Sequence, residues 1–545
     1  MVKINGINSY TFFKPTDYSI ILSLILISLI TMIAGCSQTA KDSKVPARPN
    51  ILFIMSDDHA SHAITAYGGI YDEYLQTPNI DRIANEGVKF NNVFCTNAIC
   101  GPSRATILTG KYSHANGYYK NEGGGKFDST QWTFPVAFQR NGYKTALFGK
   151  WHLGTQPVGF DYFKYHDNPG QQGYYYDPLY NENGAKVTEK GYATTLTADF
   201  ALGWLESIKD NQQPFMMMLQ FKAPHRNWEP EEKYRDLFEG IEMPYPSTFN
   251  DDYAGREQTA GDTDMTMDFF NRKDMKLAAP DGLTDKETRA WYNQGNMRGS
   301  GEGWLPHDSM TVEQARKWKY QRYIKDYLAC IKSVDDNVGR VLDYLDKAGL
   351  AENTVVIYTS DQGFYLGDHG WFDKRFMYEP SLRMPFLLRY PSMIKEPQVN
   401  QDIITNVDFA PTLLDLAGIE ESEVLQGRSF KQNILGQTPS DWEQAMYYHY
   451  YEYPFWHHVQ PHYGVRTDRF KLIHFYFDRD VWELYDLKND PDELNNLISN
   501  PEYGTVVEEL KSKMTMLQKK YKDDKSLEEF RTVTSTDFGQ LTGNH

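Results

Sequence analysis

The sequence predicts an α/β protein in which helices flank a large mixed, mainly parallel sheet, followed by a smaller C-terminal subdomain. Three observations lead to this fold class. Apolar runs of strand length alternate with segments of helical periodicity, polar residues follow directly after several of these runs, and the pattern changes after about residue 441. Continuous apolar strands are typical of parallel sheets that are covered on both faces.

The N-terminus has the pattern of an export signal. An apolar run over residues 20–33 follows two lysines and is short for a membrane span. It leads into Ile-Ala-Gly-Cys36, which resembles a bacterial lipobox, where the signal peptide is removed and the new N-terminal cysteine is acylated. We expect a signal peptide over residues 1–35, a tether over residues 36–48 and lipidation at Cys36. A plain signal peptide or a lone anchor helix is the alternative.

Composition limits the partners. The chain has 56 basic and 73 acidic residues, a formal net charge of −17, which argues against nucleic acid as a partner. An anionic substrate therefore needs local positive groups. Contact with a membrane is expected only through the lipid anchor, which would hold an exported protein in the cell envelope, in the outer membrane, facing the periplasm or the cell surface. Four cysteines in 545 residues are too few for a disulfide framework.

Polar residues follow the predicted strands in order along the chain. The first strand covers residues 50–55 and ends at Asp57 and Asp58, and a helix is expected between Pro78 and Gly87. Further strands are predicted at residues 145–148, 214–221 and 354–360, which precede Lys150 and His152, His225, and Asp361 and Gln362. Because open α/β sheets bind ligands at the carboxyl ends of their strands, these distant residues are expected to meet.

One long amphipathic helix is predicted between the third and fourth of these strands. Apolar residues recur at helical spacing over residues 312–348, and Gly349 ends the pattern. Cys330 lies beside this apolar stripe and is expected to be a buried structural thiol.

The stretch from Cys100 to Gly110 predicts a short helix with a cysteine at its N-terminus. Pro102 suits the first turn, and Gly110 ends the helix. Free N–H groups and the helix dipole favour an anion at such a position, so a thiolate nucleophile or redox cysteine with a lowered pKa is one interpretation. A buried core cysteine is the other.

The residues around Cys100 resemble a known signature. Cys-Gly-Pro-Ser-Arg, from Cys100 to Arg104 and continued by Leu-Thr-Gly110, is similar to the motif of the type I sulfatases, members of the alkaline phosphatase superfamily. The resemblance implies an alkaline-phosphatase-like sandwich. It also implies that a formylglycine-generating maturation enzyme oxidises Cys100 to formylglycine, whose hydrated aldehyde is the nucleophile. Matching motifs extend from residue 49 to about residue 497.

The resemblance also implies a divalent cation. Its ligands would be the formylglycine made from Cys100 and the side chains of Asp57, Asp58, Asp361 and Gln362. Oxygen donors without histidine or thiolate favour Ca²⁺, with Mg²⁺ as the alternative, over zinc. Gln362 stands where relatives often carry asparagine. An isolated Asp-Asp pair could equally be a helix cap or a turn, but this pair ends an apolar strand.

Five further residues match the family's catalytic motifs: Arg104, Lys150, His152, His225 and Lys374. The resemblance implies that Lys150, Lys374 and the cation bind the sulfate oxygens, that Arg104 orients the nucleophile, and that His225, assisted by Lys374, binds the substrate and protonates the leaving alcohol. His152 would take a proton from the remaining hydroxyl so that sulfate leaves. Taken alone, Lys150 and Lys374 could be surface lysines, and His152 and His225 could be structural histidines.

The C-terminal region resembles the small antiparallel-sheet subdomain of sulfatases. Residues 463–477 and 481–487 are predicted as strands and residues 506–521 as a helix, which places a catalytic domain at residues 49–440 and a subdomain at residues 441–545. An aromatic stretch before the first of these strands contains His457, His458 and His462, which are candidate substrate contacts unless the stretch only packs the core.

The expected substrate is a sulfated polysaccharide or oligosaccharide. The Lys222–Trp228 and Asp251–Arg256 stretches look like those of bacterial N-acetylglucosamine-6-sulfatases. A glycosaminoglycan, a mucin or an algal polymer such as ulvan or carrageenan fits this resemblance. The alternatives are a phosphatase or phosphodiesterase of the same superfamily, and a non-catalytic glycan-binding lipoprotein.

Overall fold

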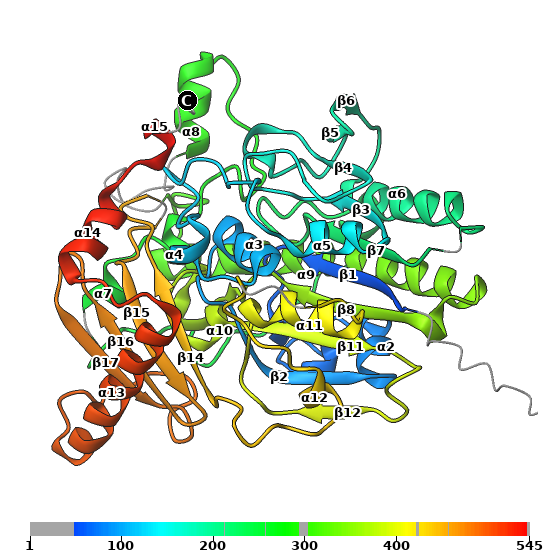
Figure 1. Ribbon diagram of the computed structural model, residues 1–545. Coiled ribbons are helices and arrows are strands. Elements are labelled where there is room, and N and C mark those ends of the chain that lie inside the picture. The colour runs from blue at the N-terminus through cyan, green and yellow to red at the C-terminus, as the bar shows by residue number, and fades with distance from the viewer. Residues whose placement is uncertain are drawn as a thin grey trace, which may run out of the picture. The chain divides into compact units, whose positions relative to one another are not determined.

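A mixed sheet, parallel through its middle strands, lies at the centre of the described part of the protein (Figure 1). The computed structural model describes residues 48–211, 213–256, 258–293, 304–420, 424–455 and 457–541. Within them the sheet has the order β12-β2-β11-β8-β1-β7-β3-β4-β5-β6, and β13 pairs with β2. Its strands are β1 (Asn50–Ser56), β2 (Val88–Phe94), β3 (Lys144–Gly149), β4 (Tyr162–His166), β5 (Leu179–Glu182), β6 (Ala185–Thr188), β7 (Phe215–Phe221), β8 (Thr354–Ser360), β11 (Arg383–Arg389), β12 (Gln398–Asn400) and β13 (Ile404–Thr405).

The four strands that the sequence predicted form the middle of this sheet. β1 pairs in parallel with β8 on one side and β7 on the other, and β3 pairs in parallel with β7 and β4. β11 and β5 run antiparallel to their neighbours, which makes the sheet mixed. The predicted fold class is therefore confirmed.

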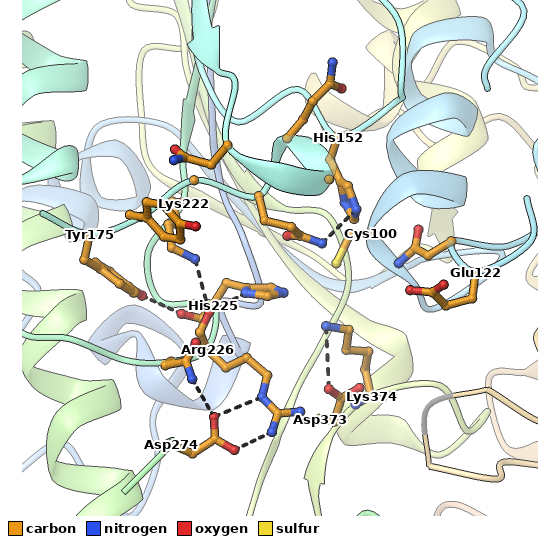
Figure 2. A pocket seen from close by; sticks show the side chains of 18 of the residues that line it. Cys100, Glu122, His152, Tyr175, Lys222, His225, Arg226, Asp274, Asp373 and Lys374 are labelled. Atoms are coloured by element: carbon orange, nitrogen blue, oxygen red, sulfur yellow. Dashed lines mark hydrogen bonds and ion pairs between the residues drawn. The ribbon is translucent and has the colours of Figure 1, made fainter. Parts of the chain in front are cut away.

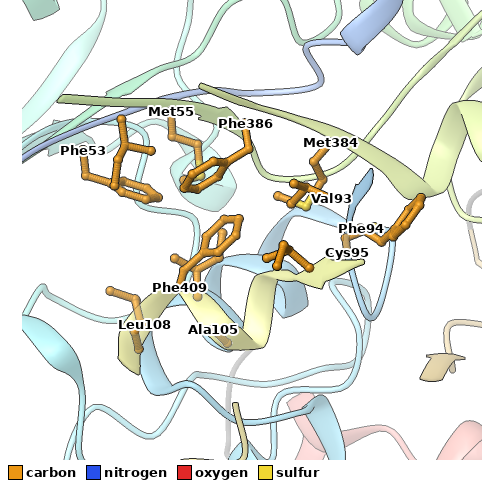
Figure 3. Close-up of a cluster of buried hydrophobic side chains, with 14 of the residues drawn as sticks. Phe53, Met55, Val93, Phe94, Cys95, Ala105, Leu108, Met384, Phe386 and Phe409 are labelled. Atoms are coloured by element: carbon orange, nitrogen blue, oxygen red, sulfur yellow. The ribbon is translucent and has the colours of Figure 1, made fainter. Parts of the chain in front are cut away.

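Helices cover both faces of the sheet, as alternate residues of β1 show. Leu52 and Ile54 belong to a buried apolar cluster with residues of α2 (Pro78–Asn85), α6 (Ala193–Ser207) and α9 (Val312–Lys347). Phe53 and Met55 point to the opposite face, where they join residues of α3 (Cys100–Thr109), α5 (Phe134–Arg140) and α11 (Phe409–Leu416). Figure 3 shows this second cluster around Phe386 and Phe409. A strand buried on both faces explains the continuous apolar run.

The long helix α9 has clear end signals. Thr311 accepts a hydrogen bond from the backbone N–H of Gln314, whose side chain in turn accepts from the backbone N–H of Thr311, so a capping box begins the helix. Gly349, with φ +68°, follows its end. The predicted helix is confirmed, and Cys330 is fully buried within it.

A second, four-stranded antiparallel sheet forms the C-terminal region. It has the order β14-β15-β16-β17, with strands Ala445–Tyr450, His462–Thr467, Phe470–Phe475 and Val481–Asp486. Helix α13 (Gly504–Tyr521) packs against it, and α14 (Leu527–Ser535) and α15 (Phe538–Leu541) follow. The predicted strand over residues 463–477 is divided into β15 and β16 because Thr467 and Phe470 close a tight turn by hydrogen bonds.

The remaining elements are short. They are β9 (Tyr365–Leu366), β10 (Phe372–Asp373), α4 (Ser113–Asn116), α7 (Gln258–Gly261), α8 (Asp285–Asn293), α10 (Glu379–Leu382) and α12 (Lys431–Ile434). The expected signal peptide, nearly all of the tether and Cys36 lie outside the described residues. In the part of the chain that the structure describes, no helix is both long enough and apolar enough to cross a membrane. The boundary at residues 440 and 441 stays a prediction.

Candidate active site

Side chains from the carboxyl ends of neighbouring strands meet at one edge of the sheet, as expected. A pocket of about 1230 Å³ opens there, and Cys100, His152, His225 and Lys374 are among its lining residues (Figure 2). Asp57, Asp58, Asp361, Gln362, Lys150 and Arg104 lie buried behind them, each at most 2% exposed. The structure thus brings together every residue that was predicted as a metal ligand or catalytic group.

Helix α3 places Cys100 at its first residue, on the wall of the pocket. The next residue must be small, because a Cβ on Gly101 would lie 2.6 Å from Asn121 Oδ1 and 2.7 Å from the Tyr118 ring. The Gly101 N–H donates to that same Asn121 oxygen at 3.1 Å, and Gly110 ends the helix in the left-handed conformation. These contacts fix the position of residue 100 from both ends of the helix.

The Cys100 thiol is not an activated nucleophile. Burial raises its pKa well above the ordinary value, and the opposing charges of Lys150 and Lys374 do not offset the burial. The expectation of a lowered pKa at this helix N-terminus is therefore wrong, because burial of the thiolate outweighs the charges of Lys150 and Lys374. The residue is also no ordinary core cysteine, because it faces the pocket.

Three carboxylates converge beside Cys100. One oxygen from each of Asp57, Asp58 and Asp361 lies within 4.8 Å of the others, and the Cys100 Sγ is 4.0 Å from Asp58 Oδ1. Burial and the neighbouring carboxylates raise the pKa of Asp58 to about 7. Burial and Asp57 likewise raise the pKa of Asp361 to about 6. A cation placed among these oxygens would remove the repulsion.

The donor set fits a divalent cation. Asp57 Oδ1 and Gln362 Oε1 are buried and accept no hydrogen bond from any described residue. The Gln362 amide nitrogen donates to Asp58 Oδ1, which fixes the side chain with its oxygen free. Buried polar atoms without partners are rare in proteins, and carboxylate and amide oxygens are ligands that Ca²⁺ and Mg²⁺ accept.

Positive side chains surround the carboxylates. Arg104 donates from Nε to Asp361 Oδ2 at 3.0 Å and from Nη1 to the Lys150 carbonyl and to Gln220 Oε1, both at 2.9 Å. Lys150 forms an ion pair with Asp57, and Lys374 Nζ is 2.9 Å from Asp58 Oδ2. Although burial opposes ionisation, Lys150, His225 and Arg104 hold the pKa of Asp57 well below its usual value.

The two predicted catalytic histidines are held in different ways. His225 Nδ1 donates to the Arg226 carbonyl at 2.7 Å, which leaves Nε2 facing Asp58 Oδ2 at 3.8 Å. His152 Nε2 lies 2.7 Å from the Gln172 amide nitrogen. Burial, followed by the charge of Lys150, lowers the pKa of both rings well below the ordinary value.

Only one of the three C-terminal histidines that were predicted as substrate contacts reaches the pocket. His457 lines it, whereas His458 lines a separate pocket of about 320 Å³ and contacts Asp264 Oδ2 at 2.6 Å. His462 is fully buried, with Nδ1 bonded to the Gln460 carbonyl and Nε2 accepting from the Met377 N–H. The prediction that His462 contacts substrate is wrong, because both its ring nitrogens are occupied inside the core. The structure does not place His458 at the main pocket either.

The structure adds pocket residues to which no role was assigned from the sequence. Lys222 follows β7 directly, as Lys150 follows β3. Its position directly after a strand could therefore have indicated a role in the pocket. Asp373 and Arg375 flank Lys374 and both have positive φ, 75° and 103°. Both side chains belong to the pocket wall. Positive φ is uncommon at non-glycine residues, and no sequence pattern predicts it at these two positions. Gln172 lies in a loop without periodicity.

Comparison with known proteins points to one family. The sulfatase family matches residues 49–419, and the family described as N-sulphoglucosamine sulphohydrolase, C-terminal, matches residues 367–520. An N-acetylglucosamine-6-O-sulfatase of Bacteroides thetaiotaomicron is 45% identical over 527 residues, which is 94% of this chain and 92% of the relative.

Solved structures agree in fold. A protein in complex with its substrate D-glucosamine-2-N,6-O-disulfate has a TM-score of 0.81 and 46% identity, covering 88% of this chain and all of that one. A phosphonate monoester hydrolase of Silicibacter pomeroyi has a TM-score of 0.67 at 20% identity, covering 87% of this chain and 96% of its own, which shows a shared fold alone. The signature at Cys100, the carboxylate cluster behind it and the match over most of the length lead to one conclusion: the chain belongs to the sulfatase family.

Proposed function

We propose that this sulfatase removes the 6-O-sulfate from N-acetylglucosamine or glucosamine units of sulfated glycans. As a sulfatase it hydrolyses sulfate esters, and the likeness over 94% of the chain to an N-acetylglucosamine-6-O-sulfatase supports this sugar and position. A glycosaminoglycan or a mucin is the substrate class that carries such units. The observation that carries the sulfate-ester chemistry is that the three carboxylates converge directly behind Cys100 and Lys374, which line one pocket.

Residue 100 is proposed to work as formylglycine, made from Cys100 by a formylglycine-generating enzyme. The buried thiol, with its raised pKa, is a poor nucleophile as it stands, which supports a chemical change before catalysis. When present, the hydrated aldehyde supplies the hydroxyl that attacks sulfur.

The cation is proposed to be Ca²⁺, with Mg²⁺ as the alternative. Asp57, Asp58, Asp361 and Gln362 would hold it, since they supply buried oxygens with no histidine or thiolate in the set. A bound cation supplies positive charge that favours the ionised hydroxyl and stabilises charge on the sulfate oxygens. Ca²⁺ suits this irregular, carboxylate-rich set better than the strictly octahedral Mg²⁺ does.

The chain's own residues divide the remaining tasks. Lys374 reaches the pocket while holding Asp58, so its ammonium group can bind a sulfate oxygen there. His225 lines the pocket with Nε2 available, so its protonated ring is placed to give a proton to the leaving alcohol. Arg104 and Lys150 hold Asp361 and Asp57 in place. His152 is the proposed acceptor of the proton at position 100.

The test is sulfate release by protein produced together with a formylglycine-generating enzyme. Release from N-acetylglucosamine-6-sulfate is expected, with little from the 3-sulfate of the same sugar or from ulvan and carrageenan oligosaccharides. A phosphate ester of the same sugar tests the phosphatase alternative, and Cys100→Ala is the matched control. Faster release from an algal oligosaccharide than from the 6-sulfated sugar would contradict the proposed substrate.

Lipid anchoring at Cys36 remains part of the proposal, supported by the lipobox-like Ile-Ala-Gly-Cys36. Incorporation of labelled palmitate into the full-length protein, lost in Cys36→Ser, is the expected result. A soluble exported protein without label would contradict it.

A further inference from the structure

We infer that Glu452 is a positioning residue that fixes Lys374 relative to the start of α3, the helix that begins at residue 100. Glu452 is fully buried and follows β14, a strand of the C-terminal sheet. Its two carboxylate oxygens bind two different segments of the pocket wall, one beside Cys100 and one beside Lys374. The inference rests on the proposed function, because it concerns groups that would act on the sulfate ester.

One carboxylate oxygen is connected to the start of α3. Glu452 Oε2 accepts from the backbone N–H of Asn121 at 2.7 Å and from that of Glu122 at 2.9 Å. The Asn121 side-chain oxygen accepts in turn from the Gly101 N–H at 3.1 Å, and residue 100 is the first residue of the same helix. The first N–H groups of a helix have no partner within it, so the Asn121 side chain supplies a partner from outside. Glu452 therefore holds the wall segment that caps the start of α3.

The other carboxylate oxygen is connected to Lys374. Arg375 donates from Nη1 to Glu452 Oε1 at 2.6 Å and to the Tyr450 hydroxyl at 3.0 Å. Arg375 follows Lys374 directly in the chain, and both line the pocket (Figure 2 shows Lys374). Since Arg375 is only 5% exposed and Glu452 is fully buried, each charge depends on the other for compensation. The two oxygens of one side chain thus serve two segments of the pocket wall.

The spacing of residues along β14 explains how Glu452 reaches this position. Side chains two residues apart lie on the same side of a strand, and Tyr448, Tyr450 and Glu452 have this spacing. All three contact Arg375, because the Tyr448 hydroxyl donates to the Arg375 carbonyl at 2.5 Å. The same hydroxyl accepts from the Ala98 N–H at 3.1 Å, shortly before α3. One row of side chains from the C-terminal sheet therefore supports both segments of the wall.

The proposed reaction needs residue 100 and Lys374 at the same sulfate group. A misplacement of about 1 Å, caused by a change remote from the reacting atoms, lowers a rate by about 10²-fold. Glu452→Met fills a similar space but accepts no hydrogen bond to nitrogen of comparable strength, so both wall segments lose their shared contact. The expected loss is in kcat, because the alignment of the reacting groups changes while the contacts to the sugar remain.

The first experiment uses protein in which Cys100 is unmodified, so it does not depend on activity. Amide hydrogen exchange is measured by mass spectrometry in the parent protein and in Glu452→Met. Exchange at Asn121, Glu122 and Gly101 is expected to become about tenfold faster or more, because hydrogen bonds to or through a charged group are lost, whereas β1 and β8 keep their rates. Unchanged exchange at Gly101, or equal acceleration in β1 and β8, would overturn the inference.

The second experiment uses converted enzyme with equal formylglycine content. Glu452→Met is expected to lower kcat for N-acetylglucosamine-6-sulfate by about 10²-fold, with KM within about threefold of the parent value. Glu452→Gln keeps one acceptor oxygen, so its kcat should lie between those of the parent and Glu452→Met. It also carries the test if Glu452→Met does not fold. A rise in KM with unchanged kcat would overturn the inference.

Glu483→Met is the matched control. Glu483 is also fully buried in the C-terminal sheet, where it accepts from the hydroxyls of Tyr378 at 2.7 Å and Tyr485 at 3.0 Å, and it lies outside the pocket lining. This variant should lose stability and keep kcat. Equal losses of kcat in Glu452→Met and Glu483→Met would mean that Glu452 only stabilises the fold. If the parent enzyme cleaves no sulfate ester at all, the proposed function fails, and hydrogen exchange still decides whether Glu452 holds the start of α3.

Discussion

Two buried polar clusters of this protein differ in whether their atoms are paired. In the sheet-edge cluster, Asp57, Asp58, Asp361 and Gln362, two oxygens lack hydrogen-bond partners among the described residues. The junction cluster consists of Glu379, Arg383, Arg466, Lys471 and Glu493. There Lys471 Nζ contacts Glu493 Oε1 at 2.6 Å and Glu379 Oε1 at 3.0 Å, and the Glu379 N–H donates to Glu493 Oε2 at 2.7 Å. Each side-chain nitrogen and oxygen of the junction cluster is either paired or reached by solvent.

This difference in pairing indicates that the sheet-edge cluster serves binding and the junction cluster serves stability. A paired cluster holds two parts of the chain together, since breaking it leaves a buried charge without compensation. A cluster with unpaired buried oxygens does not stabilise a fold, and it indicates a site that is completed by a bound ligand. Changes in the sheet-edge cluster should therefore abolish activity, and changes in the junction cluster should lower stability.

The largest effect is expected from Asp58→Ala, which removes one ligand of the proposed cation. The rate of sulfate release should fall by about 10³-fold or more, because charge stabilisation at the sulfate oxygens is lost. The measurement compares proteins with equal formylglycine content. A loss below tenfold would show that the sheet-edge cluster does not hold the catalytic cation.

Lys374→Met should have the next largest effect. Lys374 Nζ contacts Asp58 at the pocket, so its loss should lower kcat/KM by about 10²-fold. Lys273→Met is the matched control, because Lys273 lines the same pocket at an exposed position. Equal losses in the two variants would mean that general positive charge, and not the position of Lys374, matters.

Lys471→Met tests the junction cluster. Lys471 and Glu493 are fully buried, so the substitution should lower the free energy of unfolding by about 3–5 kcal/mol, while kcat of the folded enzyme stays unchanged. Urea denaturation measures the first quantity and initial rates the second. A stable variant with reduced kcat would reverse the assignment of the two clusters.

Removal of the cation should act on the sheet-edge cluster alone. Chelation followed by addition of Ca²⁺ at about a hundred times its dissociation constant should raise the free energy of unfolding by about 2.7 kcal/mol. The same increment is expected in Lys471→Met, since the two clusters share no residue. Different increments would show that the clusters are coupled.

The smallest expected effect is a pH dependence from Lys222. Burial lowers the pKa of this pocket lysine to about 8. As pH rises through this value Lys222 loses its positive charge, so kcat/KM for an anionic sulfate ester should fall severalfold above pH 8. Lys222→Arg should remove this decline, because arginine stays charged. An unchanged alkaline limb in that variant would assign the decline to another group.

The sheet-edge cluster could be predicted from the sequence because its determinants are local. β1, β7 and β8 are buried on both faces and therefore appear as continuous apolar runs, and the polar residues follow them directly. Cys100 begins a helix whose proline and terminal glycine are visible in the sequence.

The parts that escaped prediction depend on tertiary contacts. Of the three histidines predicted as substrate contacts, only His457 lines the main pocket, because His462 lies in β15 with both ring nitrogens bonded and His458 lines a separate pocket. The raised pKa of Cys100 follows from burial by segments far apart in the chain. Gln172 meets His152 across 20 residues, through a loop whose course no periodicity sets.

The most direct measurement combines the chemical state of residue 100 with sulfate release. Protein batches produced with different amounts of a formylglycine-generating enzyme are treated with a hydrazide, the adduct on the peptide containing residue 100 is quantified by mass spectrometry, and sulfate release from N-acetylglucosamine-6-sulfate is measured on untreated samples. The rate is predicted to rise in proportion to the labelled fraction and to vanish in Cys100→Ala. Full labelling without sulfate release, or release by Cys100→Ala, would contradict the account.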